Sequence, residues 1–166
     1  HALLQLPVES WTKQKKKVLF VENQDSFSFN IIALIKNLGA DVAIAQLPAH
    51  FDPKDFSHVV IGPGPGNPKH LPELEKLIKI VLEARLPLLG ICLGHQAIGH
   101  YFGAAIIKRP PIHGLSLPIN HSQERLFSGL PTPMPFTRYH SLAVNQAPPD
   151  FLVDAVSQDD CIMAIS

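Results

Sequence analysis

Cys92 stands in the segment of this sequence whose residue types best suit nucleophilic chemistry. It follows the apolar run 87–91 and has a glycine two residues away on either side, Gly90 and Gly94. This spacing is the cysteine form of a nucleophile elbow, where a strand turns sharply into a helix. Side chains at the two glycine positions would collide with neighbouring backbone. A helix that begins at this turn favours the thiolate of Cys92, because its unpaired N–H groups carry partial positive charge.

A buried structural cysteine at a strand end is the alternative for Cys92. The two glycines and the adjoining His95-Gln96 pair favour the catalytic interpretation. The other cysteine, Cys161, lies in the apolar run 160–165 and is expected to belong to the core. Two cysteines do not make a disulfide framework, so we interpret Cys92 as a free thiol.

The loop of residues 62–68, with the sequence GPGPGNP, is the second segment with chemical potential. A glycine-rich loop after a strand suggests a phosphate cradle, but the prolines here have no N–H to donate. No Gly-Lys-Ser/Thr follows, which excludes a Walker loop. A rigid loop that offers one or two fixed N–H groups suits a single developing oxyanion instead. A tight turn without a catalytic role is the alternative.

Composition narrows the class of protein. Of the 166 residues, 46% are hydrophobic, enough for a sizeable core in one domain. Basic and acidic residues balance at 14 each, so charge gives no argument for nucleic acid or a membrane as partner. No apolar run approaches the roughly 20 residues of a membrane span, and we see no signal peptide. We therefore expect a cytoplasmic protein, and neither a cofactor nor a metal ion.

Strands alternate with helices after residue 17, which predicts a three-layer α/β fold, flavodoxin-like or Rossmann-like, with a mostly parallel sheet. The expected strands are 18–21, 42–45, 58–61 and 88–91. The first expected helix is capped by Asp25 or Ser26 and runs through Leu38, and the others are 72–84 and 96–102. The first helix is expected to bury Phe29, Ile32, Ile35 and Leu38, and the second Leu74, Leu77, Ile78 and Val81. Gly39 is expected to end the first helix.

The C-terminal third is expected to add a small antiparallel region. Its predicted strands are 104–108, 115–120, 135–139, 151–156 and 161–165. Residues 1–17 are interpreted as a linker or an added extension, and 18–166 as the folded domain. Segments 23–26 and 62–68 and Cys92 each follow a predicted parallel strand. Because sites in such sheets form beyond the carboxyl ends of the strands, we expect these segments to meet at one edge.

These motifs resemble the class I (triad) glutamine amidotransferase family. Segments 90–96 (GICLGHQ) and 62–68 carry the resemblance. Segments 25–30 (DSFSFN), 113–114 (HG) and 138–144 (RYHSLAV) narrow it to the amidotransferase subunit of anthranilate synthase (component II) and of aminodeoxychorismate synthase. The resemblance covers residues 18–166, nearly the whole chain.

The resemblance implies a glutaminase reaction. The thiolate of Cys92 attacks the side-chain amide carbonyl of L-glutamine, and the backbone N–H groups of Gly64 and Leu93 form the oxyanion hole. Ammonia leaves, water hydrolyses the thioester, and the ammonia passes to a chorismate-binding synthase subunit (component I) of tryptophan or folate biosynthesis. The implied glutamine-binding residues are Gly64, Pro65, Gly66, Gln96, Ser141 and Leu142.

One part of the family pattern does not occur among the 166 residues. The family's catalytic base is the His of a His-Pro-Glu triplet near the C-terminus, and this sequence has no such triplet. By motif, His95 and His140 are the nearest candidates, although His140 belongs to the family's substrate and interface segment. We expect either that the C-terminal part of the domain is missing from this sequence or that the chain is inactive as given.

Two rival functions follow from the same residues. One is a binding or regulatory subunit that keeps the fold and lacks the base. The other is a redox or stress protein with a cysteine elbow on a similar sheet. The Gly-Pro loop and the segment that begins at Arg138 argue against the second rival.

Overall fold

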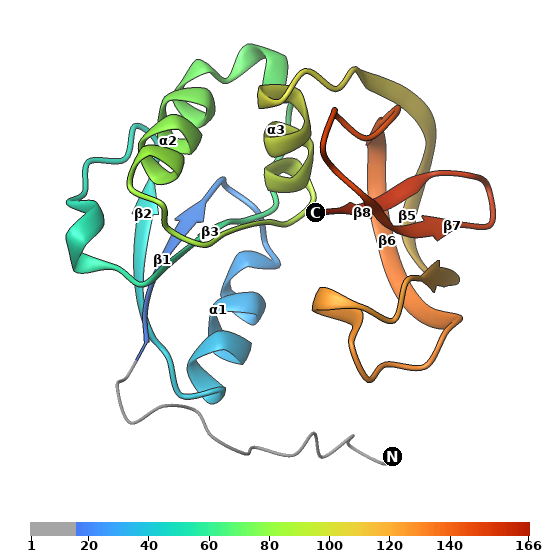
Figure 1. Cartoon of the computed structure of the whole chain (residues 1–166), viewed down its shortest axis with the longest axis horizontal. Coiled ribbons are helices and arrows are strands. Elements are labelled where there is room, and N and C mark those ends of the chain that lie inside the picture. Colours follow the sequence, from blue (N-terminus) through green and yellow to red (C-terminus); the bar gives the residue numbers. More distant parts are fainter. Residues whose placement is uncertain (1–15) are drawn as a thin grey trace.

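The computed structural model describes residues 16–166, which form two four-stranded sheets (Figure 1). The predicted extension 1–17 lies outside the described residues, apart from Lys16 and Lys17. Four strands form the first sheet in the order β2-β1-β3-β4, and every pairing in it is parallel. Their bounds are β1 (Lys17–Glu22), β2 (Asp41–Gln46), β3 (His58–Ile61) and β4 (Leu88–Gly90).

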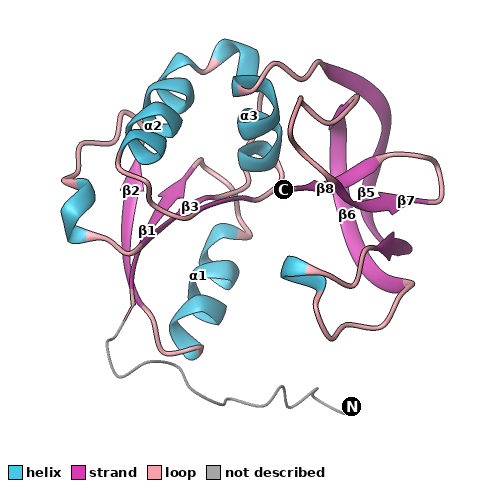
Figure 2. Cartoon of the chain, in the orientation of Figure 1, coloured by secondary structure: helices cyan, strands magenta, loops and turns pink. Residues whose placement is uncertain are grey.

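Helices cover both faces of the parallel sheet, which confirms the predicted three-layer α/β fold (Figure 2). One face packs against α1 (Ser28–Asn37), and the other packs against α2 (Pro72–Glu83) and α3 (Leu93–Tyr101). Because side chains alternate along a strand, Leu19 faces α2 and α3, whereas Phe20 faces α1.

Helix α2 buries the predicted stripe. Its members recur at helical spacing and are all at most 3% exposed: Leu74, Leu77, Ile78 and Val81. Pro72 opens the helix, where a missing N–H costs no hydrogen bond. Glu73 and Glu75 lie in the first turn, and their negative charges suit the positive end of the helix dipole.

The buried face of α1 differs from the prediction. Ile32 is buried as expected, but Phe29 and Leu38 are 64% and 65% exposed. Two overlapping stripes of apolar residues run along this helix. The face that packs against the sheet includes Ile31 and also the small, fully buried Ser28. A serine lets the helix approach the sheet where a phenylalanine would hold it away.

The ends of α1 also refine the prediction. The helix begins at Ser28, so neither Asp25 nor Ser26 is its cap, and the carboxylate of Asp25 accepts the N–H of Phe27 at 2.8 Å. This bond forms a local turn before the helix instead of a cap on it. At the other end, Gly39 follows the last turn with φ +92°, a left-handed conformation that suits glycine.

The second sheet is antiparallel, with the order β6-β5-β7-β8. Its strands are β5 (Ile106–His121), β6 (Met134–Val144), β7 (Val153–Ser157) and β8 (Ile162–Ile165). The two predicted strands 104–108 and 115–120 are therefore one long strand, β5. Its register with β6 shifts between Lys108 and Ile112, and Pro110 and Pro111 occupy this irregularity, where no ladder bond is required of them.

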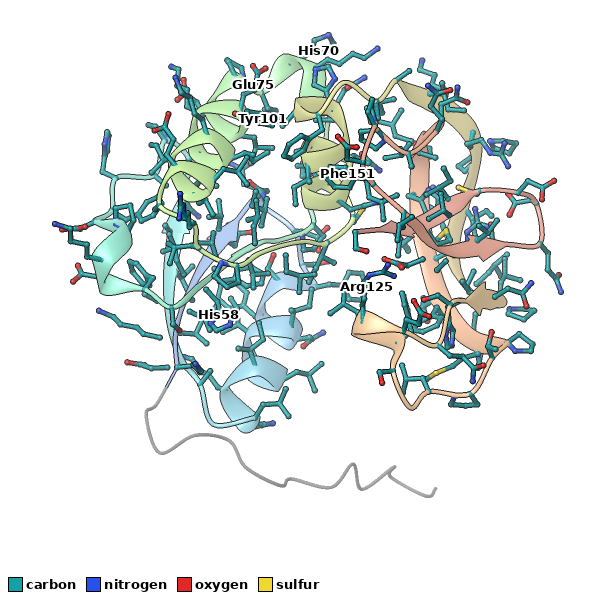
Figure 3. All side chains as sticks on the ribbon, in the orientation of Figure 1. His58, His70, Glu75, Tyr101, Arg125 and Phe151 are labelled. Carbon is teal, nitrogen blue, oxygen red and sulfur yellow. The ribbon has the colours of Figure 1, made fainter. Side chains whose placement is uncertain are left out.

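Helix α3 connects the two sheets. It contacts β3 and β4 of the first sheet and β6 and β8 of the second. Phe102, just after the helix, packs against Phe151, with ring centroids 4.9 Å apart. Figure 3 labels Phe151. Within residues 16–166, none of the helices has the length and hydrophobicity needed to cross a bilayer.

Candidate active site

Cys92 lies at a sharp turn between β4 and α3. The strand ends at Gly90 and the helix begins at Leu93, so Cys92 is the residue that precedes the helix. Its backbone has φ +53° and ψ −105°, a region that residues other than glycine rarely adopt. The predicted nucleophile elbow is therefore present, and its strained residue is the cysteine.

The glycines on either side of Cys92 allow the close packing of this turn. A Cβ atom added to Gly90 would lie 2.4 Å from the carbonyl carbon of Gly94. One added to Gly94 would lie 2.2 Å from the carbonyl oxygen of Ile61 in β3. These contacts confirm the predicted collisions with backbone at both positions.

The helix N-terminus acts on the Cys92 thiol as predicted, but burial outweighs this effect and the net pKa is raised. Burial raises the pKa of the Cys92 thiol, and the negative charge of Asp25 raises it further. The N–H of Leu93 lowers the pKa, as expected at a helix N-terminus, but this effect is smaller than that of burial. Nucleophilic attack by this cysteine therefore requires removal of its proton.

The Gly-Pro loop lies against the start of α3. A Cβ atom added to Gly64 would be 2.9 Å from Cδ2 of Leu93 and 2.5 Å from Cβ of Asn23. The side-chain amide of Asn23 also donates to the carbonyl of Gly62 at 3.0 Å and so holds the start of the loop. Segments that follow β1, β3 and β4 thus meet at one edge of the sheet, as predicted. The contribution of Asn23 to the loop was not predicted.

The residues expected to bind glutamine lie on α3, in the Gly-Pro loop and on β6. Gln96 is buried on α3, and its side-chain amide donates to the carbonyl of Leu142 on β6 at 2.9 Å. Ser141 adjoins Leu142 and is exposed, as are Pro65 and Gly66 in the loop. Gly66 has φ +94°, which suits glycine. The structure thus joins Gln96 to Leu142 by a hydrogen bond.

A cleft of about 1640 Å³ includes Cys92, Gln96 and Leu142. Asp25 and Pro63 line it from the parallel sheet's edge, and residues of the antiparallel sheet line it from the other side. The cleft therefore provides space for a small molecule beside the thiol. In the described part of the chain, no three His, Cys, Asp or Glu side chains are placed to hold a metal ion.

Comparison with known families tests whether this elbow and glycine loop belong to the family that the sequence resembles. The family model described as "Glutamine amidotransferase class-I" matches residues 19–166. The chain belongs to this family. The predicted resemblance is confirmed, and it covers the parallel sheet, the elbow and the antiparallel sheet.

Relatives within the amidotransferase family have two kinds of name. Anthranilate synthase component 2 of Thermococcus kodakarensis is 37% identical over 152 residues, which cover 88% of this chain and 77% of the relative. Aminodeoxychorismate synthase of Streptomyces pristinaespiralis is 36% identical over 160 residues, which cover 90% of this chain. The match spans only 22% of that longer relative.

Solved structures share the fold of this amidotransferase chain. A protein of Thermoplasma acidophilum superposes with a TM-score of 0.81 over 93% of this chain and 79% of its own, at 24% identity. A glutamine amidotransferase of Thermotoga maritima superposes with a TM-score of 0.73 over 92% of this chain and 72% of its own, at 19% identity. Likeness at this level of identity establishes the fold alone.

Neither candidate base of the amidotransferase chain hydrogen-bonds to Cys92 among residues 16–166. His140 uses both ring nitrogens, at 2.9 Å to the carbonyl of Leu142 and at 3.3 Å to Nε of Arg138. Burial and the nearby His140 lower the pKa of His95 to about 4, and its Nε2 atom is buried without a hydrogen-bond partner. His140 is therefore committed to other partners, and His95 is neutral at physiological pH.

Arg138 has a structural role that was not predicted, although its segment belongs to the family pattern. Only 2% of its surface is exposed, and its guanidinium pairs with Asp159, with 2.5 Å between Nη1 and Oδ1. Its place in the predicted strand 135–139 is the feature that could have drawn attention to it, because a charge buried by a sheet requires a partner.

Proposed function

We propose that residues 18–166 are the amidotransferase domain of a chorismate-using synthase. In this proposal the domain hydrolyses L-glutamine and passes ammonia to a chorismate-binding synthase subunit or domain (component I). The observation that carries the proposal is the strained Cys92 elbow, which lines a cleft together with Gln96 and Leu142. Relatives named for anthranilate synthase and for aminodeoxychorismate synthase match at 37% and 36% identity, so the proposal includes both products.

The proposed reaction begins with attack of Cys92 sulfur on the amide carbonyl of glutamine. The negative charge that develops on the carbonyl oxygen would be stabilised by the N–H groups of Gly64 and Leu93. Leu93 directly follows Cys92, and Gly64 lies against the side chain of Leu93. The proton lost by the thiol is transferred to the leaving nitrogen, and ammonia departs. Water then hydrolyses the glutamyl thioester and restores the thiol.

The other residues that the family resemblance implies are proposed to hold the substrate. Gln96 and the backbone groups of Ser141 and Leu142 would hold the glutamine, together with Pro65 and Gly66 of the loop. A cytoplasmic location is part of the proposal, because a free nucleophilic thiol persists in a reducing compartment.

A second candidate function is a glutamine-binding or regulatory subunit of the same fold. The observation that favours it is the lack of a hydrogen bond from His95 or His140 to Cys92 within the described residues, because a cysteine nucleophile with a raised pKa requires a base. The two candidate functions predict the same substrate affinity and differ in turnover.

Two measurements separate these functions. Glutamine is first tested for protection of Cys92 against iodoacetamide, with asparagine as the matched non-substrate. Glutamate release is then measured with the synthase partner and chorismate present, with Cys92→Ser as the inactive control. Protection with release supports the amidotransferase function. Protection without release supports the binding subunit, and equal labelling with and without glutamine overturns both.

A further inference from the structure

We propose that His140 is a positioning residue for glutamine binding. In this proposal the Arg138–Asp159 ion pair holds His140, His140 fixes the carbonyl of Leu142, and that carbonyl fixes the side-chain amide of Gln96. The proposal deepens the proposed function and rests on it, since Gln96 is there assigned to the substrate.

The hydrogen-bond partners of His140 determine its tautomer. The carbonyl of Leu142 can only accept a hydrogen bond, so Nδ1 of His140, 2.9 Å away, must carry a proton. The guanidinium of Arg138 can only donate, so Nε2 of His140, 3.3 Å from Nε of the arginine, must be unprotonated. His140 is therefore neutral, with its proton on Nδ1, and its ring orientation is set from both sides.

The arginine that sets this orientation is itself fixed. Arg138 is buried, and Asp159 accepts from both of its terminal nitrogens, at 2.5 and 3.4 Å. Asp159 also accepts from the hydroxyl of Ser157 at 2.6 Å and from Arg109 at 3.2 Å. These donors, Arg138 first, hold the pKa of Asp159 well below its usual range, so the carboxylate remains charged.

The carbonyl of Leu142 accepts two hydrogen bonds, one from His140 and one from Nε2 of Gln96 at 2.9 Å. Because Nε2 of Gln96 is the donor, its Oε1 atom is the acceptor that remains for a ligand in the cleft. An oxygen acceptor suits the ammonium group of an amino acid. Gln96 lies one helical turn after Cys92, so this bond also ties the helix behind the nucleophile to β6.

Two substitutions test the roles of the two ring nitrogens of His140 one at a time. Asparagine places an N–H near the position of Nδ1, and so retains the donor to Leu142 but loses the contact with Arg138. Glutamine reaches the position of Nε2 and does the reverse. Both variants are polar and smaller than or similar in size to histidine, so they serve as controls for one another.

The measurement is the concentration of glutamine that halves the rate of Cys92 alkylation by iodoacetamide. We expect His140→Gln to require about tenfold more glutamine than the wild type, as expected for the loss of one buried hydrogen bond. His140→Asn, which loses only the contact with Arg138, should require less additional glutamine than His140→Gln. The alkylation rate without glutamine is measured for each variant, and its protection is expressed relative to that rate. Equal protection of His140→Gln and wild type, or equal losses in both variants, overturns the positioning role.

A wild type that glutamine does not protect overturns the proposed function instead, and the two failures are thus distinguishable. A second measurement does not depend on any variant. The ¹⁵N resonances of His140 in the wild-type chain should show a protonated Nδ1 and an unprotonated Nε2. A proton on Nε2 would contradict the proposed chain of hydrogen bonds directly.

Discussion

Gly94 lies so close to Ile61 that an added Cβ atom would be 2.2 Å from the carbonyl oxygen of Ile61. Ile61 is the last residue of β3, and Gly94 lies in the first turn of α3. This contact sets how closely the helix that follows Cys92 approaches the sheet. The position of the thiol above the sheet edge therefore depends on the absence of a side chain two residues later.

Alanine at Gly94 or Gly90 should destabilise the fold severely. The added atom would meet backbone at 2.2 or 2.4 Å, and the backbone cannot move without disrupting the elbow. We expect the free energy of unfolding to fall by about 3 kcal/mol or more, measured by urea denaturation. Gly99→Ala in the same helix is the matched control, since its nearest neighbour is the side chain of Val144 at 3.0 Å. It should change stability by at most about 1 kcal/mol, and a similar result for Gly94→Ala would contradict the close-packing argument.

Cys92 should be the thiol that reacts fast with a glutamine-mimicking electrophile. Cys161 is only 2% exposed, whereas Cys92 is half-buried and lines the cleft. Mass spectrometry of the labelled peptides measures the distribution of the reagent. Early labelling of Cys161 in folded protein would show that the cleft does not give access to Cys92.

The alkylation rate of Cys92 should rise with pH through pH 9. The thiolate is the reactive form, and burial followed by the charge of Asp25 raises the pKa of this thiol, so its thiolate fraction is still increasing there. Asp25→Asn removes the charge and retains an oxygen that can accept the N–H of Phe27. It should lower the pKa and speed alkylation at neutral pH. A rate that is already constant above pH 7 would show that the thiol is ionised at rest.

Truncation of Ile78 should be costly, whereas truncation of Ile80 should not. Both lie in α2, but Ile78 is fully buried against the sheet and Ile80 is 40% exposed. Ile78→Ala should lower the free energy of unfolding by about 2–5 kcal/mol, and Ile80→Ala should lower it by roughly 0.5 kcal/mol or less. Equal losses in thermal or urea unfolding would contradict the observed face of the helix.

Gly64→Pro should abolish most glutaminase turnover in the complex with the synthase partner, if the proposed oxyanion hole is correct. Proline removes the N–H donor, and losing one such donor costs about 2.7–4 kcal/mol in the transition state, a factor of roughly 10²–10³ in rate. Proline also adds a Cβ atom, which would lie 2.5 Å from Cβ of Asn23, so Gly64→Ala, which adds the same atom and keeps the N–H, is the matched control. Glutamine protection of Cys92 would show that the variant's cleft still forms, and near-normal turnover would rule out the donor.

Local patterns were sufficient to predict the parallel sheet, α2 and the elbow. The stripe that includes Leu74 and Ile78 has one helical phase, so only one face can be buried. In α1, a second phase through Ile31 was equally available, and contact with the sheet selected it. Periodicity alone does not distinguish two overlapping stripes.

Long-range contacts explain the features that sequence reasoning missed. Pro110 and Pro111 suggested a break, yet pairing with β6 continues past them through a shift in register. The raised pKa of Cys92 depends on how deeply the fold buries the thiol, which the adjoining helix did not reveal. The bond between Gln96 and Leu142 joins residues 46 positions apart, so only the assembled fold brings them together.

The positive φ of Cys92 also restricts which nucleophile this scaffold can use. At φ +53° a branched Cβ atom would crowd the adjoining backbone, so threonine and valine are strongly disfavoured there. Cysteine and serine have a single heavy atom beyond Cβ and are accommodated more easily. The turn therefore restricts the type of reactive side chain as well as its position. A version of this fold with serine at residue 92 keeps the backbone of the turn, whereas one with threonine, a secondary alcohol, does not.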